Sequence, residues 1–113
     1  MKKVKMTMAA RRLYNQRKRL TRAKEEYYVA KRCADSESGA VNLCAWSICE
    51  DLIRHRDISD SVLDTYKEFR NRADRATRRF EKAQEDLVIQ SARFREMHKR
   101  ASAHDVGLSI SIP

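Results

Sequence analysis

Glycine and proline are almost missing from this sequence of 113 residues, which contains two glycines and one proline. Between Ala40 and Val106 there is neither. A β-sheet protein needs a turn about every 8–12 residues, and such turns are usually built with Gly, Pro, Asn or Asp. Ala, Arg, Lys, Glu and Leu, which favour helices, are abundant instead. The sequence therefore predicts an all-α fold.

Long apolar runs are missing as well, since no stretch approaches the ~18 apolar residues that a membrane-spanning helix needs. The basic start of the chain is not followed by the apolar core of a secretory signal. The three cysteines are an odd number, which fits reduced thiols better than a disulfide framework. We therefore expect a cytoplasmic protein that does not associate with membranes.

Residue patterns that would support catalysis or hold a cofactor are not found. Cys44 and Cys49 would point about 140° apart on a helix, and Cys33 is the one other thiol, so a zinc site is not expected. The three histidines are scattered along the chain, and the two distant glycines cannot form a phosphate-binding loop. The sequence predicts a protein that is not an enzyme and that binds no cofactor or metal.

A seven-residue repeat marks the first predicted helix, about residues 4–34. Its a row contains Met6, Leu13, Leu20, Tyr27 and Ala34, and its d row contains Ala9, Gln16, Ala23 and Ala30. Rows with this spacing form the seam between paired helices. Residues 35–39 should end this helix, because Asp, Ser and Gly favour turns. A short, deeply buried helix over about residues 40–55 should follow, with Trp46 beside its apolar face.

The second long helix, about residues 60–103, has the clearest repeat. Its a row contains Tyr66, Ala73, Phe80, Leu87, Phe94 and Ala101, and its d row contains Val62, Phe69, Ala76, Ala83, Gln90 and Met97. Ser61 and Asp64 resemble a capping box at its start. At ~1.5 Å per residue this helix is too long for a round domain. We predict an elongated antiparallel helical hairpin or coiled coil, with a short third helix between the two long ones, in one domain over residues 1–106.

Pairing symmetric about the middle helix would place Gln16 opposite Phe80 and Gln90 opposite Met6. The two polar residues of the d rows would then not meet. Gly107 should end the second long helix, and the tail over residues 107–113 alternates apolar residues with serine. Such a tail is either loose or docked on a partner.

The net charge of +9 matches that of residues 1–35, which contain twelve basic and three acidic residues. The g positions, which border the seam, are mostly basic in both long helices: Arg12, Arg19, Arg72, Arg79, Arg93 and Arg100. Antiparallel pairing places g against g, so this edge of the hairpin should be like-charged. Either an acidic partner relieves that repulsion, or one seam pairs with something other than its neighbour.

These features favour a non-enzymatic interaction module, an adaptor or an inhibitor, that docks a basic helical face on the acidic surface of a larger protein or nucleoprotein. The basic residues expected to do so are Arg11, Arg12, Arg17, Lys18, Arg19 and Arg22. Apolar contacts are expected from Val88, Ile89 and the tail residues Leu108, Ile110 and Ile112. Incompletely covered seams also favour self-association into a homo-oligomer.

The alternative function is DNA or RNA binding without sequence specificity by the first helix. Arg and Lys neutralise phosphates without a fixed geometry. Tyr14, Tyr27 and Tyr28 lie in that helix and could stack on bases, although Tyr27 belongs to the seam. A basic helix can also be no more than a solvated surface, and the sequence leaves all three interpretations open.

Overall fold

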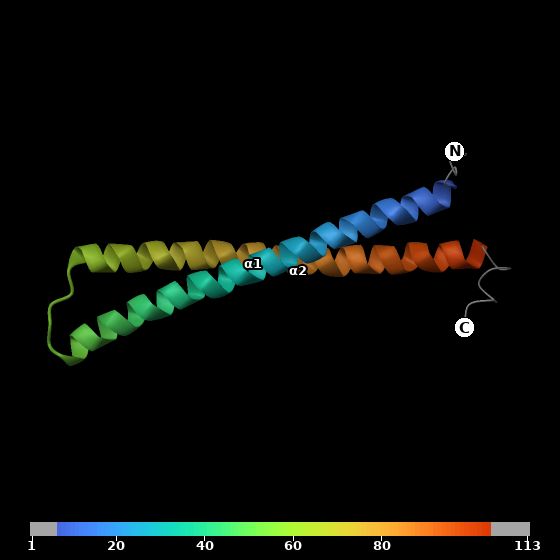
Figure 1. The fold of residues 1–113 in the computed structure, drawn as a ribbon. Coiled ribbons are helices and arrows are strands. Elements are labelled where there is room, and N and C mark those ends of the chain that lie inside the picture. Colours follow the sequence, from blue (N-terminus) through green and yellow to red (C-terminus); the bar gives the residue numbers. More distant parts are fainter. Residues whose placement is uncertain (1–6, 105–113) are drawn as a thin grey trace, which may run out of the picture. The chain divides into compact units, whose positions relative to one another are not determined.

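The computed structural model describes residues 7–104, and these residues form two helices joined by a short connection (Figure 1). Helix α1 spans Met8–Ile53 and helix α2 spans Asp60–His104. Within the described residues there is no strand, and the prediction of an all-α fold is confirmed there. The expected helix end at Gly107 and the tail over residues 107–113 lie outside the described residues.

Helix α1 passes through residues 35–39 without interruption, so the predicted break and the separate third helix over residues 40–55 are wrong. Glycine inside a helix costs only about 1 kcal/mol relative to alanine, and Asp and Ser cost less. The seven-residue repeat continues across this stretch, with Ala34, Val41 and Ile48 shielded from water. Packing of a continuous apolar row outweighs such small local preferences.

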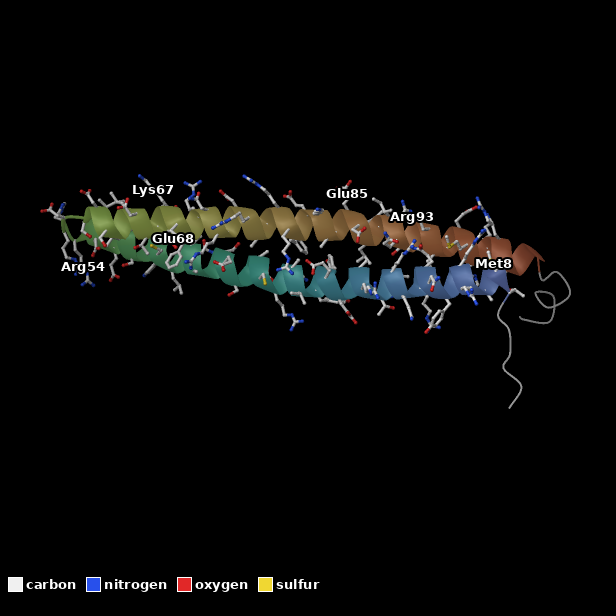
Figure 2. All side chains as sticks on the ribbon, turned by 90° about the horizontal axis from the view of Figure 1, so that it is seen from above. Met8, Arg54, Lys67, Glu68, Glu85 and Arg93 are labelled. Atoms are coloured by element: carbon white, nitrogen blue, oxygen red, sulfur yellow. The ribbon has the colours of Figure 1, made fainter. Side chains whose placement is uncertain are left out.

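The chain divides into two compact units, and each unit contains a segment of both helices. In unit 1, the described residues are 7–26 of α1 and 84–104 of α2. Unit 2 covers residues 27–83, which include the connection between the helices. Within each unit the two helical segments run antiparallel. Charged side chains such as Glu85 in unit 1 and Lys67 in unit 2 point away from α1 (Figure 2).

The residues shielded from water in each unit are mainly those of the a and d rows. The most deeply buried hydrophobic side chains are alanines, Ala23 in unit 1 and Ala30, Ala34 and Ala83 in unit 2. Small side chains at a helical contact allow a short distance between the helix axes. Larger side chains alternate with them, and in unit 2 the ring of Tyr27 packs against Phe80 at 5.3 Å between centroids.

A pair of glutamines sets the register of unit 1. Gln16 is 1% exposed and is the largest fully buried side chain of the described residues. Its Nε2 donates hydrogen bonds to Oε1 of Gln90, at 2.7 Å, and to the carbonyl oxygen of Gln90, at 3.3 Å. The prediction that the glutamines would not meet is therefore wrong. Because α1 is continuous, the chain turns later than expected, and the partner of Gln16 lies ten residues beyond Phe80.

Helix α1 ends in a Schellman motif built around a histidine. The N–H of His55 donates to the carbonyl of Leu52, at 3.1 Å, and the N–H of Arg56 donates to the carbonyl of Asp51, at 2.8 Å. His55 takes the left-handed position that this motif requires, with φ of 57°. Arg56 and Asp51, whose positions in the motif usually make a hydrophobic contact, form an ion pair at 3.2 Å instead.

Helix α2 begins at a serine cap, but not at the serine that the sequence suggested. The Oγ of Ser59 accepts a hydrogen bond from the N–H of Val62 at 3.3 Å. Ser59 is therefore the N-cap, and Ser61 with Asp64 do not form the predicted capping box. The acidic residue of the first turn, Asp60, interacts favourably with the helix dipole.

The continuity of α1 predicts that replacing Gly39 by alanine stabilises the protein. Gly39 lies inside the helix, and a Cβ atom there would meet nothing within 4 Å. Gly39→Ala should raise the free energy of unfolding by roughly 0.5–1 kcal/mol, measured by chemical denaturation. Unchanged or lower stability would show that α1 is not helical at residue 39 in solution.

The glutamine pair predicts strong energetic coupling. Gln90→Leu should lower the free energy of unfolding by ~1–3 kcal/mol, because the buried amide of Gln16 loses its side-chain partner. Adding Gln16→Leu should recover that loss, because the seam then becomes apolar on both sides. The exposed Gln84 provides the control, and Gln84→Leu should change stability by less than about 0.5 kcal/mol. Additive effects of the two seam substitutions in urea denaturation would contradict the observed pairing.

Candidate functional site

All six basic residues singled out from the sequence lie on α1 in unit 1, and all six are exposed. They occupy the outward side of the helix and both borders of the seam: Arg11, Arg12, Arg17, Lys18, Arg19 and Arg22. We call this set the basic surface. Three of its members, Arg17, Lys18 and Arg22, line a shallow hollow of about 350 Å³.

A hollow of about 270 Å³ adjoins the basic surface within unit 1. Arg12 of α1 and Arg100 of α2 line it together with three apolar residues, Ala9, Met97 and Ala101. No acidic residue lines this hollow. Two guanidinium groups beside an apolar lining form a site for a carboxylate or phosphate that is attached to an apolar group.

The register extends this arrangement along the same edge of unit 1. Arg19 lies one heptad after Arg12 and Arg93 lies one heptad before Arg100, so in an antiparallel pair they share the same border of the seam. We call Arg12, Arg19, Arg93 and Arg100 the basic edge. The expectation that g faces g is thus confirmed where Arg12 and Arg100 line one hollow. In unit 2, the g residues Cys33 and Arg79 approach to 4.0 Å between Sγ and Nη1.

Arg100 also pairs with Glu96 on its own helix, with Nε and Oε1 3.2 Å apart. Both side chains are largely exposed, and an exposed pair four residues apart contributes only about 0.3–0.5 kcal/mol. A guanidinium has five N–H donors, and this pair uses one of them. Arg100 therefore keeps donors with which it can bind an external carboxylate.

Of the three tyrosines of α1, Tyr14 and Tyr27 are partly covered by other side chains, whereas Tyr28 is exposed. Nζ of Lys18 lies 4.7 Å from the ring centroid of Tyr14, so a cation covers one face of that ring. Tyr27 is half-buried against Phe80. Tyr28 is exposed, and its ring meets that of Tyr27 edge to face at 5.4 Å.

Val88 and Ile89 lie in unit 1 on the outer side of α2, and both are exposed. Both residues were expected from the sequence to provide apolar contacts to a partner. The tail residues Leu108, Ile110 and Ile112, which were expected to provide further apolar contacts, lie outside the described residues.

The described residues contain no group of three or more His, Cys, Asp or Glu side chains arranged to hold a metal ion. Cys33, Cys44 and Cys49 are free thiols. In the same part of the chain, neither helix is apolar enough over a sufficient length to cross a membrane.

Arg93 and Arg100 were expected from the sequence to lie on a like-charged edge, but they were not among the residues predicted to bind a partner. Met97 was expected to belong to the seam and to have no further role. The missing information was the register, because Arg12 can be matched with Arg100 only when α1 is continued to residue 53. The unbroken repeat from Ala34 to Ile48 was the signal that could have given it.

No protein-family model matches this sequence, and comparison with curated proteins and with solved structures gives no match.

Proposed function

We propose that the protein is a non-enzymatic interaction module, an adaptor or an inhibitor, that docks the basic edge and basic surface of unit 1 on an acidic surface of a larger protein. The observation that carries this proposal is the hollow in which Arg12 and Arg100 stand beside Ala9, Met97 and Ala101. A partner segment with neighbouring acidic and aliphatic side chains would satisfy both parts of this hollow. Its carboxylate would bind the guanidinium groups, and its aliphatic side chain would cover the apolar lining.

The charge of the basic edge supports a partner of this kind. Four arginines border one side of the seam in unit 1, where the pairing of the helices brings them together. Each exposed like-charged pair costs only a few tenths of a kcal/mol, roughly, in the free protein. Carboxylates of an acidic partner would offset this repulsion, because they attract all four arginines. Arginine also suits carboxylates, because its planar group can donate two parallel hydrogen bonds to one carboxylate.

Nucleic acid is the alternative partner for the same charges. A sugar–phosphate backbone would use the arginines and lysines but would leave the apolar lining beside Met97 uncovered. The ring of Tyr14 already has Lys18 over one face, which reduces its value as a stacking platform. Both features favour an acidic amphipathic protein segment over DNA or RNA.

The test compares binding of fluorescent probes by anisotropy. An acidic amphipathic peptide with alternating clusters of Glu and Leu should bind at least ~10-fold more tightly than polyglutamate of equal charge, since about 1.4 kcal/mol of apolar burial gives a factor of ten. Arg12→Ala with Arg100→Ala should weaken peptide binding by ~10-fold or more through lost charge-assisted hydrogen bonds. The melting temperature should change little, because removal of the like-charged pair offsets loss of the exposed Arg100–Glu96 ion pair.

The matched control is Arg95→Ala with Lys99→Ala, which removes the same charge from exposed positions of α2 in unit 1. These residues do not line the hollow, so peptide affinity should change by no more than ~2–3-fold through the general field. A short DNA duplex should bind more weakly than the peptide at 150 mM salt. Tighter binding of the duplex, with equal losses for both double variants, would replace the proposal by nucleic-acid binding.

A further inference from the structure

Unit 2 exposes an apolar stripe on the side of α1 that faces away from α2. Leu43 is 74% exposed, Trp46 is 72% exposed and Ile53 is 78% exposed. Cys49 lies on the same face and is also exposed. These residues recur at spacings of three and four, so they form one continuous row on the helix surface. We call Leu43, Trp46, Cys49 and Ile53 the outer stripe.

The charges around the outer stripe do not oppose contact with an identical surface. From residue 33 to residue 53 the chain has no lysine or arginine. On the outward positions between Gly39 and Ile53, Glu50 is the one ionisable acid. Its Oε1 already pairs with Nη2 of Arg54 at 3.0 Å. The outer stripe is therefore apolar and nearly neutral, in a chain that otherwise carries a large positive charge.

The order of side-chain sizes along the outer stripe is self-complementary. Gly39 and Ile53 each lie seven residues from Trp46, and Leu43 and Cys49 each lie three residues from it. A two-fold axis beside Trp46 makes the second helix run antiparallel. It then brings the large Ile53 of each copy to the bare backbone at Gly39 of the other, where a Cβ would meet nothing within 4 Å.

We propose that the outer stripe is the interface of a homodimer, in which α1 of one copy crosses α1 of a second copy about a two-fold axis at Trp46. Such an interface uses one surface patch on both copies, so each contact occurs twice. Leu43 of each copy meets Cys49 of the other, and Glu50 falls near the uncharged Asn42. No like-charged residues are brought together within this patch.

The area of the outer stripe sets the strength of the dimer. Its exposed apolar side chains offer on the order of 500 Å² per copy, near the upper end for the largest patch on a monomer. A standard stable interface uses about 800 Å² per partner. The dimer is therefore weak, with dissociation in the micromolar range. This inference is independent of the proposed function, which uses unit 1.

Trp46 is the one tryptophan of the chain, so its fluorescence reports on the interface directly. The full chain at 1–200 μM should change from monomer to dimer in sedimentation equilibrium, with a blue shift of the Trp46 emission over the same range. Leu43→Glu should weaken dimerisation at least ~10-fold, because it places a charge in the apolar contact of both copies. Val88→Glu, at a position 65% exposed in unit 1, should leave the dimer unchanged.

A monomer at 200 μM would overturn the inference, as would equal losses of dimer with Leu43→Glu and Val88→Glu at unchanged helix content. The two-fold arrangement has its own test in a Cys33→Ser, Cys44→Ser background. There, Leu43→Cys should form a covalent dimer with Cys49 of the second copy under mild oxidation. Val29→Cys, an exposed position on the same helix, should not. Equal crosslinking of both variants would show that the copies do not meet in this way.

Discussion

Everything in this structure depends on an unbroken seven-residue repeat along α1. The repeat passes through a stretch with Asp35, Ser38 and Gly39, which on local preference alone would end a helix. These residues lower the stability of the helix by a few kcal/mol at most. Each heptad of the seam offsets part of that loss, because it buries apolar side chains of both helices. Because α1 continues to Ile53, the chain turns at residues 54–59, and this position of the turn fixes which residues face each other.

The composition of the seam also determines which side chains are exposed on the surface of each unit. The most deeply buried hydrophobic side chains of the seam are alanines, which are small. Many of the larger hydrophobic side chains are exposed instead. The arginines border the seam in unit 1, while Leu43, Trp46 and Ile53 lie on the outward side of α1 in unit 2. The basic surface and the outer stripe therefore differ in chemistry and lie in different units. A basic surface and a neutral apolar stripe can serve different partners without competing.

The sequence was informative where one physical signal dominated and misleading where two competed. The a and d rows of α2 were predicted correctly because burial repeats over six heptads without interruption. In α1 the turn-forming residues 35–39 competed with the repeat, and local preference was given too much weight. That one error also displaced the register. It separated Gln16 from Gln90 and hid the match between Arg12 and Arg100, because a turn placed too early shifts every cross-helix pair.

The buried glutamines explain why this register is kept although it brings like charges together. Sliding α2 by one heptad would retain apolar rows at the seam and would place Asp86 opposite Arg19, where Arg93 now lies. That exchange would gain only a few tenths of a kcal/mol, roughly, at an exposed edge. It would also separate Gln16 from Gln90 and leave a buried amide without its partner, at a cost of ~1–3 kcal/mol. The amide pair therefore outweighs the repulsion, and the arginines of the basic edge are held on one border of the seam.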